Sequence, residues 1–334
     1  MLRIACLILF VVRFMGAFWA ISLPDVTMKH QPDFSMRRVE QDHAELVGLL
    51  TKLVGLEGFL PTALPEVRLF HSRGAHPPRP IVYEPSIVIV AQGSKRGRLG
   101  NRTFVYDARN YLVLSLPLPF ECQTLGRPEE PMLALCIRVS PVSVAELLLA
   151  SDPPLSAGTD AAQSIDATPV TPDLLGAAVR LARCLNSPPE DRVLGPQLVR
   201  EIIYRVLCGP RGNALRALAT PQSKVSRIAR SLRRIHLDYA RPLDVGLLAR
   251  EASMSPSTFH ANFKAVTAQP PQRYLQTIRL HKAHAIIAGG AAVSEAARQV
   301  GYESPSQFSR EFKRLFGGTP KDFGRRHRSL MFAF

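Results

Sequence analysis

The feature that most constrains the fold of this chain is an internal repeat at an offset of 49 residues near its C-terminal end. Residues 255–264 read SPSTFHANFK and residues 304–313 read SPSQFSREFK, so six of the ten positions are identical. The match continues downstream, where Pro271 aligns with Pro320. A repeated segment of this length is typical of a copied supersecondary unit, so the last third of the chain is predicted to fold as two similar units.

Each copy has the pattern of a helix-turn-helix. A short alanine-containing helix is predicted before each repeat, over 245–252 and 294–300, and Gly301 can take the positive φ that a tight second turn requires. Ser-Pro-Ser then suits a helix start, with serine as the N-cap and proline in the first turn. We therefore predict two recognition helices, over 257–265 and 305–315, of the kind that enters a DNA major groove.

The two faces of these predicted helices differ in character. Phe259 and Phe263 are four residues apart and share a face, as do Phe308 and Phe312, so we expect all four in the core. The predicted base-reading residues lie on the opposite faces: Ser257, Thr258, His260 and Ala261 in the first unit, and Ser306, Gln307, Ser309 and Arg310 in the second. Arg310 is the best guanine reader among them, because arginine can donate two hydrogen bonds to one guanine. The alternative interpretation is an ordinary duplicated helical hairpin with solvated polar faces.

The charge distribution indicates a polyanionic partner. Residues 211–334 contain 21 Lys and Arg against 7 Asp and Glu, so they carry +14 of the formal net charge of +15. Basic side chains that neutralise phosphates release condensed counterions, which favours nucleic acid. Lys264, Lys313 and Arg279 are the predicted phosphate contacts. A predicted helix over 271–288 would fix the separation of the two units. If that separation is about 34 Å, one turn of B-DNA, both units can enter successive major grooves of double-stranded DNA.

The preceding part of the chain changes to a β pattern. Short apolar runs are separated by turn residues, which predicts an antiparallel sandwich or barrel; the runs are 81–83, 87–91, 102–106, 111–116 and 133–139. Helices are predicted on either side of them, over 39–60, 173–185 and 194–207. The Pro/Ser/Ala/Thr-rich stretch 151–172 is expected to be a loop.

The predicted barrel is expected to bind a small molecule or a second protomer, since alternate strand residues line a barrel interior. The aromatic candidates for such a pocket are Tyr83, Phe104, Tyr106 and Phe120, and core packing is the alternative role for each. The five cysteines are scattered and contain no C-x-x-C pair, which predicts neither a disulfide framework nor a zinc site. No cofactor or metal is expected.

Residues 223–328 resemble the DNA-binding domain of AraC/XylS-type regulators. The resemblance rests on LAREASMS at 248–255 with FHANFK at 259–264, and in the second unit on VGYES, FSREFK and GTPKDF, which end at residues 304, 313 and 323. It departs from the family pattern at Ala261, where members often have arginine, so the first unit is expected to read bases less sharply than the second.

Residues 50–205 resemble more loosely the cupin-like sensor and dimerisation module of one branch of that family, through IVIVAQG at 87–93 and YLVLS at 111–115. The expected fold is α+β: a cupin-like antiparallel β-barrel with flanking helices over 36–210, a linker over 211–222, and an all-α domain of two helix-turn-helix units over 223–328.

The resemblance implies a sequence-specific, effector-responsive DNA-binding transcriptional regulator without enzymatic activity. Its implied partners are double-stranded DNA, a small-molecule effector, RNA polymerase if it activates transcription, and a second copy bound through the N-terminal domain. Two alternatives stay open: a metal-dependent barrel enzyme, and a membrane-anchored sensor with an attached helical domain.

Residues 1–35 are an apolar extension whose segment 4–23 has the length of a membrane-spanning helix. We expect translation to begin later, at Met28 or Met36. A membrane anchor is a second interpretation, and a cleaved signal peptide is a third that conflicts with a DNA-binding function. The expected location is the cytoplasm, at the nucleoid.

Overall fold

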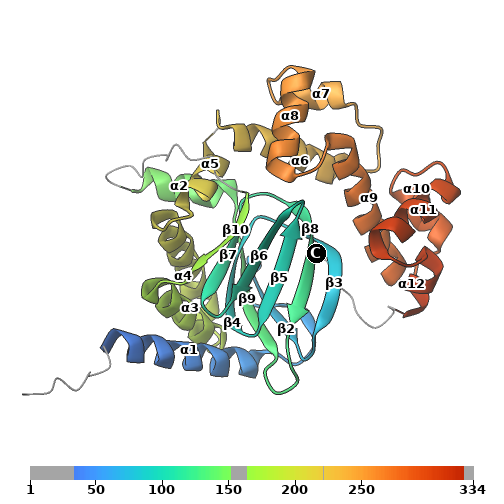
Figure 1. Ribbon diagram of the computed structural model, residues 1–334. Coiled ribbons are helices and arrows are strands. Elements are labelled where there is room, and N and C mark those ends of the chain that lie inside the picture. Colours follow the sequence, from blue (N-terminus) through green and yellow to red (C-terminus); the bar gives the residue numbers. More distant parts are fainter. Residues whose placement is uncertain (1–33, 152–163, 221, 327–334) are drawn as a thin grey trace, which may run out of the picture. The chain divides into compact units, whose positions relative to one another are not determined.

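The computed structural model describes residues 34–151, 164–220 and 222–326 (Figure 1). Its first helix is α1 (Phe34–Leu53). Nine strands follow: β1 (Gly58–Pro61), β2 (Val67–Ser72), β3 (His76–Tyr83), β4 (Ser86–Gln92), β5 (Ser94–Leu99), β6 (Arg102–Asp107), β7 (Asn110–Leu114), β8 (Leu118–Leu125) and β9 (Met132–Arg138). The next elements are α2 (Pro141–Leu149), β10 (Ile165–Pro169), α3 (Pro172–Leu185), α4 (Glu190–Cys208) and α5 (Gly212–Ala219).

The strands form one antiparallel sheet, as predicted. The strand order is β1-β2-β9-β4-β7-β6-β5-β8-β3, and β10 pairs with β7. In the middle of the sheet, Ile87 of β4 lies opposite Ile137 of β9 on one side and Val113 of β7 on the other. The order runs from β1 to β3 along the described strands, so the sheet is a half-barrel with two ends.

Both faces of this sheet are buried, which explains the continuous apolar runs in its central strands. Side chains alternate between the faces along β4: Ile87 and Ile89 belong to one hydrophobic core, and Val88 and Val90 belong to another. Residues of α1, α3 and α4 pack into the first core, and Figure 1 shows α3 and α4 on that side of the sheet. The predicted flanking helices are therefore present, with α3 and α4 close to their predicted bounds.

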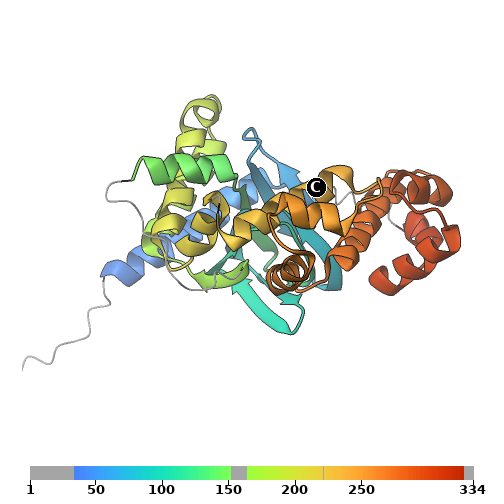
Figure 2. The ribbon, with the colours of Figure 1, turned by 90° about the horizontal axis from the view of Figure 1, so that it is seen from above.

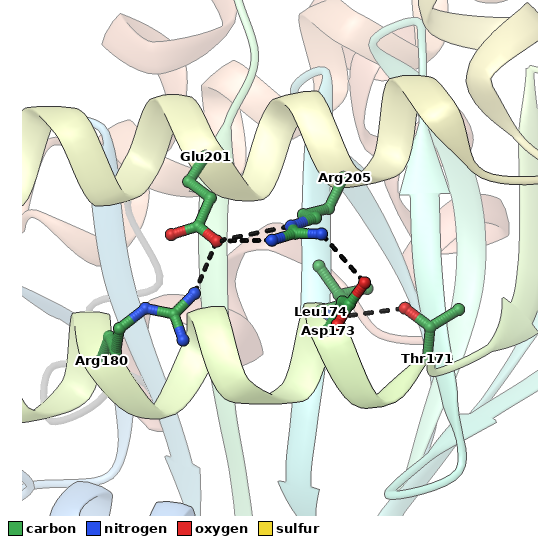
Figure 3. Close-up of polar contacts among 6 residues, drawn as sticks. All are labelled: Thr171, Asp173, Leu174, Arg180, Glu201 and Arg205. Atoms are coloured by element: carbon green, nitrogen blue, oxygen red, sulfur yellow. Dashed lines mark hydrogen bonds and ion pairs between the residues drawn. The ribbon is translucent and has the colours of Figure 1, made fainter.

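Polar contacts connect α3 to α4 on their solvent side (Figure 3). Thr171 caps α3 by accepting a hydrogen bond from the backbone N–H of Leu174 at 3.3 Å. The Glu201 carboxylate accepts hydrogen bonds from Arg180 at 2.5 Å and from Arg205 at 3.2 Å. These contacts fix the register of two helices whose apolar faces cover the sheet.

Three parts of the structure differ from the sequence-based expectation. The strand β10 lies inside the stretch 151–172 that was expected to be a loop, because its polar sequence IDATP becomes a strand only by pairing with β7. The helix α5 occupies most of the expected linker 211–222, and its Leu215 is fully buried. The sheet also begins at Gly58, inside the helix that was predicted over 39–60.

The segment 4–23 and the rest of the N-terminal extension up to residue 33 lie outside the described residues. Within the part of the chain that the structure describes, no helix combines the length and the apolar character needed to cross a bilayer.

The remaining helices form two similar units joined by one long helix. The first unit consists of α6 (Lys224–Asp238), α7 (Val245–Glu251) and α8 (Pro256–Thr267), and α9 (Pro271–Ala288) leads away from it. The second unit consists of α10 (Val293–Gln299), α11 (Pro305–Phe316) and α12 (Pro320–Arg326). Figure 2 shows α9 running from the first unit to the second, as the sequence predicted.

Candidate nucleic-acid interface

The two copies of the repeat build the same local geometry. Ser255 caps α8 and Ser304 caps α11, each accepting a hydrogen bond at 3.3 Å from the backbone N–H three residues later. Both helices then end in a residue with left-handed backbone, Ala268 with φ +60° and Gly317 with φ +76°, at equivalent positions of the repeat. Matched caps at both ends give α8 and α11 the same length of 12 residues.

The turns that precede the two recognition helices use different residues. In the second unit Gly301 has φ +82°, as predicted, whereas in the first unit the positive φ of +54° falls on Ser253. A non-glycine residue in this region costs free energy that glycine does not pay. The first turn is therefore the more strained of the two.

The four phenylalanines of the repeat form the inner face, as predicted. Phe259, Phe263 and Phe312 are fully buried and Phe308 is 1% exposed. Within each helix the two rings lie close together, with centroids 5.5 Å apart in α8 and 5.6 Å apart in α11. This aromatic pair anchors each recognition helix and turns its other face outward.

The predicted base-reading residues lie on that outward face. All eight are exposed except Ser309, which is half-buried. Two of them interact with the helix caps: the Thr258 hydroxyl accepts a hydrogen bond from Ser255 at 2.8 Å, and the Ser306 hydroxyl lies 3.0 Å from that of Ser304. The structure therefore places each set on one exposed surface, at the N-terminal half of its helix.

Arg310 and Gln307 differ in how they are held. The exposed guanidinium of Arg310 has no hydrogen-bond or ion-pair partner among the described residues. Gln307 instead donates to the Glu311 carboxylate at 3.1 Å, and the Tyr302 hydroxyl donates to the same carboxylate at 2.6 Å. Burial, followed by the hydrogen bond to Glu311, raises the pKa of Tyr302. The sequence reading missed this Tyr302–Glu311–Gln307 network, which orients Gln307 at the protein surface.

The three predicted phosphate contacts differ in exposure. Lys264 and Lys313 are exposed at equivalent positions of the repeat. Arg279 is half-buried in α9 and donates to three backbone carbonyls: Tyr239 at 2.7 Å, Gly301 at 3.1 Å and Arg241 at 3.0 Å. This structural use of Arg279 differs from the predicted phosphate contact and gives that prediction no support.

Two histidines are buried among these helices. His236 of α6 lies 2.8 Å from the Tyr274 hydroxyl of α9, and burial, followed by the positive charge of Lys282, lowers its pKa to about 4. The Nε2 of His281 is buried with no hydrogen-bond partner among the described residues. Burial and the neighbouring histidines lower the pKa of His281 to about 3. Both rings are therefore neutral at ordinary pH.

The inner face of the half-barrel holds the predicted pocket aromatics. Tyr83, Phe104, Tyr106 and Phe120 are all at most 6% exposed, and the rings of Tyr83 and Phe104 contact that of Phe120 with centroids 5.3 and 5.6 Å away. Tyr83 also lines a cavity of about 630 Å³, whereas the other three rings are core residues that do not line it. The cavity lies between the β3 side of the sheet and the C-terminal helices, which contribute His281 and Phe316 to its wall.

Lys95 of β5 is the residue of this pocket that the sequence reading missed. Its side chain is buried, lines the same cavity, and donates to the Tyr83 hydroxyl at 3.0 Å. The ammonium also lies 3.3 Å from the centroid of the Phe70 ring, within cation–π range. No carboxylate pairs with it among the described residues, and burial lowers its pKa. Burial alternates along SKRGRL in the structure and puts Lys95 on the inner face, but the polar sequence of this strand has no matching hydrophobic alternation that could have predicted it.

Comparison with known proteins supports both halves of this description. A family model of the AraC-type transcriptional regulator N-terminus matches residues 63–214, and a helix-turn-helix domain model matches residues 248–326. ToxT from Vibrio cholerae, solved with an unsaturated fatty acid bound, is similar in structure with a TM-score of 0.57 and 12% sequence identity. That similarity covers 80% of this chain and 97% of the ToxT chain, and it concerns the fold alone.

Two curated relatives match the helical region. A Streptomyces lividans protein described as an AraC-like transcription regulator is 38% identical over 104 residues, which is 31% of this chain and 34% of the relative. The transcriptional activator RhaS of Escherichia coli is 31% identical over 102 residues, which is 30% of this chain and 37% of the relative. The chain thus matches about a third of these relatives' length. The chain therefore combines an AraC-type transcriptional regulator N-terminus with a C-terminal helix-turn-helix domain.

Proposed function

We propose that this chain is an effector-responsive, sequence-specific DNA-binding transcriptional regulator. The observation that carries the proposal is the pair of matched recognition helices, α8 and α11, each anchored by two buried phenylalanines with a polar face exposed. In the proposed complex these helices enter successive major grooves. Base edges would be read by Ser257, Thr258, His260 and Ala261 in the first groove and by Ser306, Gln307, Ser309 and Arg310 in the second.

The two units are proposed to contribute unequally. Arg310 is exposed and uncommitted, so it can donate to guanine O6 and N7. The first unit has Ala261 at the equivalent position, which offers only a methyl group. Lys264 and Lys313 would contact phosphates, which fixes the position of each helix without reading sequence.

A mobility-shift assay on the DNA segment upstream of the protein's own gene tests this proposal. The full chain is expected to form a discrete complex that survives excess random DNA at about 0.1 M salt. A scrambled fragment of the same length and base composition is the control. Equal binding to the two fragments would refute sequence-specific recognition.

We further propose that the effector carries an anionic group. The support is Lys95, a buried ammonium that lines the 630 Å³ cavity without a carboxylate partner among the described residues. A buried charge is costly unless it is paired, so a ligand carboxylate at this position would gain a charge-assisted hydrogen bond. The cavity volume is within the range of small-molecule sites.

Thermal unfolding with a series of straight-chain monocarboxylates and their methyl esters tests the effector class. Bound ligand stabilises the folded state by about 2.7 kcal/mol at 100 times its Kd, so an acid that binds is expected to raise Tm while its ester does not. Lys95→Met keeps the length of the side chain and should abolish the difference between acid and ester. Equal shifts by acids and esters, or a preference that survives in Lys95→Met, would overturn the anionic class.

The remaining partners follow from this role. We propose contact with RNA polymerase if the protein activates transcription, and a homodimer through the N-terminal domain. A chromosomal target would place the protein in the cytoplasm, at the nucleoid. The absence of enzymatic activity is likewise proposed, on the ground that the matched relatives are named transcription regulators and activators.

A further inference from the structure

The two helix-turn-helix units belong to different hydrophobic cores: the first unit shares its core with the inner face of the sheet, and the second unit has another. Phe263 belongs to the core of the first unit and Phe312 to that of the second. The connecting helix α9 contributes to both, and the change from one to the other occurs within three residues, between Ile278 in the first core and Leu280 in the second. Tyr239, at the end of α6, also packs against both cores, so the apolar contact between the two units lies beside residue 279.

Arg279 stands at that change and binds both units. Its Nε donates to the carbonyl of Tyr239 and its Nη2 to that of Arg241, in the loop between α6 and α7 of the first unit. Its Nη1 donates to the carbonyl of Gly301, in the turn between α10 and α11 of the second. The guanidinium is planar and rigid, so its three N–H donors fix the position of α9 relative to the α6–α7 loop and to the α10–α11 turn.

A close approach of backbone to backbone lies beside these hydrogen bonds. Gly301 packs against Ala240, so that a Cβ built on Gly301 would lie 2.3 Å from the Ala240 carbonyl oxygen. Gly301 also has φ +82°, which disfavours any other residue. The turn of the second unit therefore rests directly on the loop of the first, and only glycine fits there.

We propose that Arg279 and Gly301 form a joint that sets the separation and rotation of α8 and α11, and thereby the spacing between two base sites that the protein accepts. Arg279 is a positioning residue in this scheme and touches no DNA. The inference rests on the proposed function, since it concerns how the two units meet one DNA duplex.

The expected effect of the joint is specific to spacing. Once one recognition helix is bound, the second binds intramolecularly, with an effective concentration that is highest when the geometry matches the site. Loosening the joint lowers that concentration at the correct spacing and raises it at incorrect ones. A residue that only stabilised the fold, or only contacted phosphate, would change affinity equally at every spacing.

Affinity measurements on DNA sites with altered spacing test the joint. The two half-sites are separated by insertions or deletions of 1–3 base pairs, and the Kd ratio between the altered and the natural spacing is measured for each variant. Arg279→Ala is expected to reduce that ratio at least tenfold relative to the unmodified chain. Arg233→Ala, at an exposed arginine of α6, removes the same charge and is expected to leave the ratio unchanged.

Two further variants separate the geometry from general damage. Arg279→Lys keeps the charge but not the three-donor fork, so its ratio should fall between those of the unmodified chain and Arg279→Ala. Gly301→Ala leaves Arg279 intact, adds a methyl group at the close approach, and should also reduce the ratio. A loss of affinity by one common factor at all spacings, for Arg279→Ala, would overturn the proposal.

A measurement without DNA distinguishes failure of this inference from failure of the proposed function. Spin labels are attached through p-acetylphenylalanine at positions 265 and 314, which are exposed and equivalent in the repeat. The unmodified chain should give one narrow distance distribution, and Arg279→Ala should broaden or shift it. An unchanged narrow distribution in Arg279→Ala would refute the joint, whereas a broadened one in a chain that binds no specific DNA would support the joint and refute the proposed function.

Discussion

Acidification is expected to destabilise the helical region through His236. The imidazole of His236 is packed between α6 and α9, and its pKa of about 4 in the folded chain lies below the ordinary value of about 6.5 that it regains on unfolding. The unfolded state therefore binds the proton more tightly. The corresponding stability is fully present above pH 6.5 and is lost as the pH falls from 6.5 towards 4.

The magnitude follows from the two pKa values. At pH 5 the proton linkage of His236 lowers the free energy of unfolding by about 2 kcal/mol relative to pH 8. His281, with a pKa of about 3, lowers it in the same direction by a similar amount. Together the two rings are expected to remove about 4 kcal/mol between pH 8 and pH 5, a large share of the stability of an ordinary domain.

Urea unfolding of the full chain at half-unit steps from pH 8 to pH 5 measures this loss. The variant His236→Gln can still hydrogen-bond to Tyr274 but does not titrate, so about 2 kcal/mol of the pH-dependent loss should disappear. The control Tyr274→Phe removes the hydrogen bond and keeps the titrating ring, so it should lower stability at all pH values and keep the slope. An identical slope in His236→Gln and in the unmodified chain would refute the reasoning.

The remaining predictions concern recognition and packing. Arg310→Ala should weaken binding to the cognate site by about 1–3 kcal/mol and relax base preference. Lys313→Ala should weaken binding to all DNA sequences alike and reduce the slope of log K against log salt concentration by about 1. Fluorescence anisotropy on cognate and random DNA measures both effects. Phe312→Ala, at a fully buried ring, should cost about 3–5 kcal/mol in the unfolding of the second unit, seen by hydrogen exchange of α11. Glu201→Ala should cost at most about 1 kcal/mol in thermal unfolding, because its partners Arg180 and Arg205 are 46% and 37% exposed. A loss well above 2 kcal/mol at Glu201 would show that the α3–α4 network (Figure 3) is worth more than a surface ion pair.

The recognition helices were predictable because the signals that form them are local. A capping serine, a first-turn proline and two phenylalanines four residues apart are all contained in ten residues of sequence. The central strands were predictable for a similar reason, since burial on both faces gives the uninterrupted apolar run of β4. Local capping and periodicity therefore sufficed for the elements that carry most of the exposed candidate site.

The features that could not be predicted depend on residues distant in sequence. The polar segment of β10 becomes a strand through pairing with β7, more than fifty residues earlier. Arg279 looks like any other basic helix residue, and its role depends on carbonyls 40, 38 and 22 residues away. Lys95 is a polar residue in a polar strand, and it is buried by contacts with Tyr83 of β3 and Phe70 of β2. Long-range contacts of this kind leave no periodic trace in the sequence.

The separate cores of the two units also determine how damage spreads through the molecule. A lesion in the second core, such as a truncated Phe308, would disable one recognition helix and leave the first unit and the sheet standing. Such a chain would keep only the first unit, which reads bases less sharply, so intact copies that bind with both units would outcompete it at an operator. In a cell with both forms, a missense change at Phe308 is then expected to be recessive to the intact gene, as an early stop codon is.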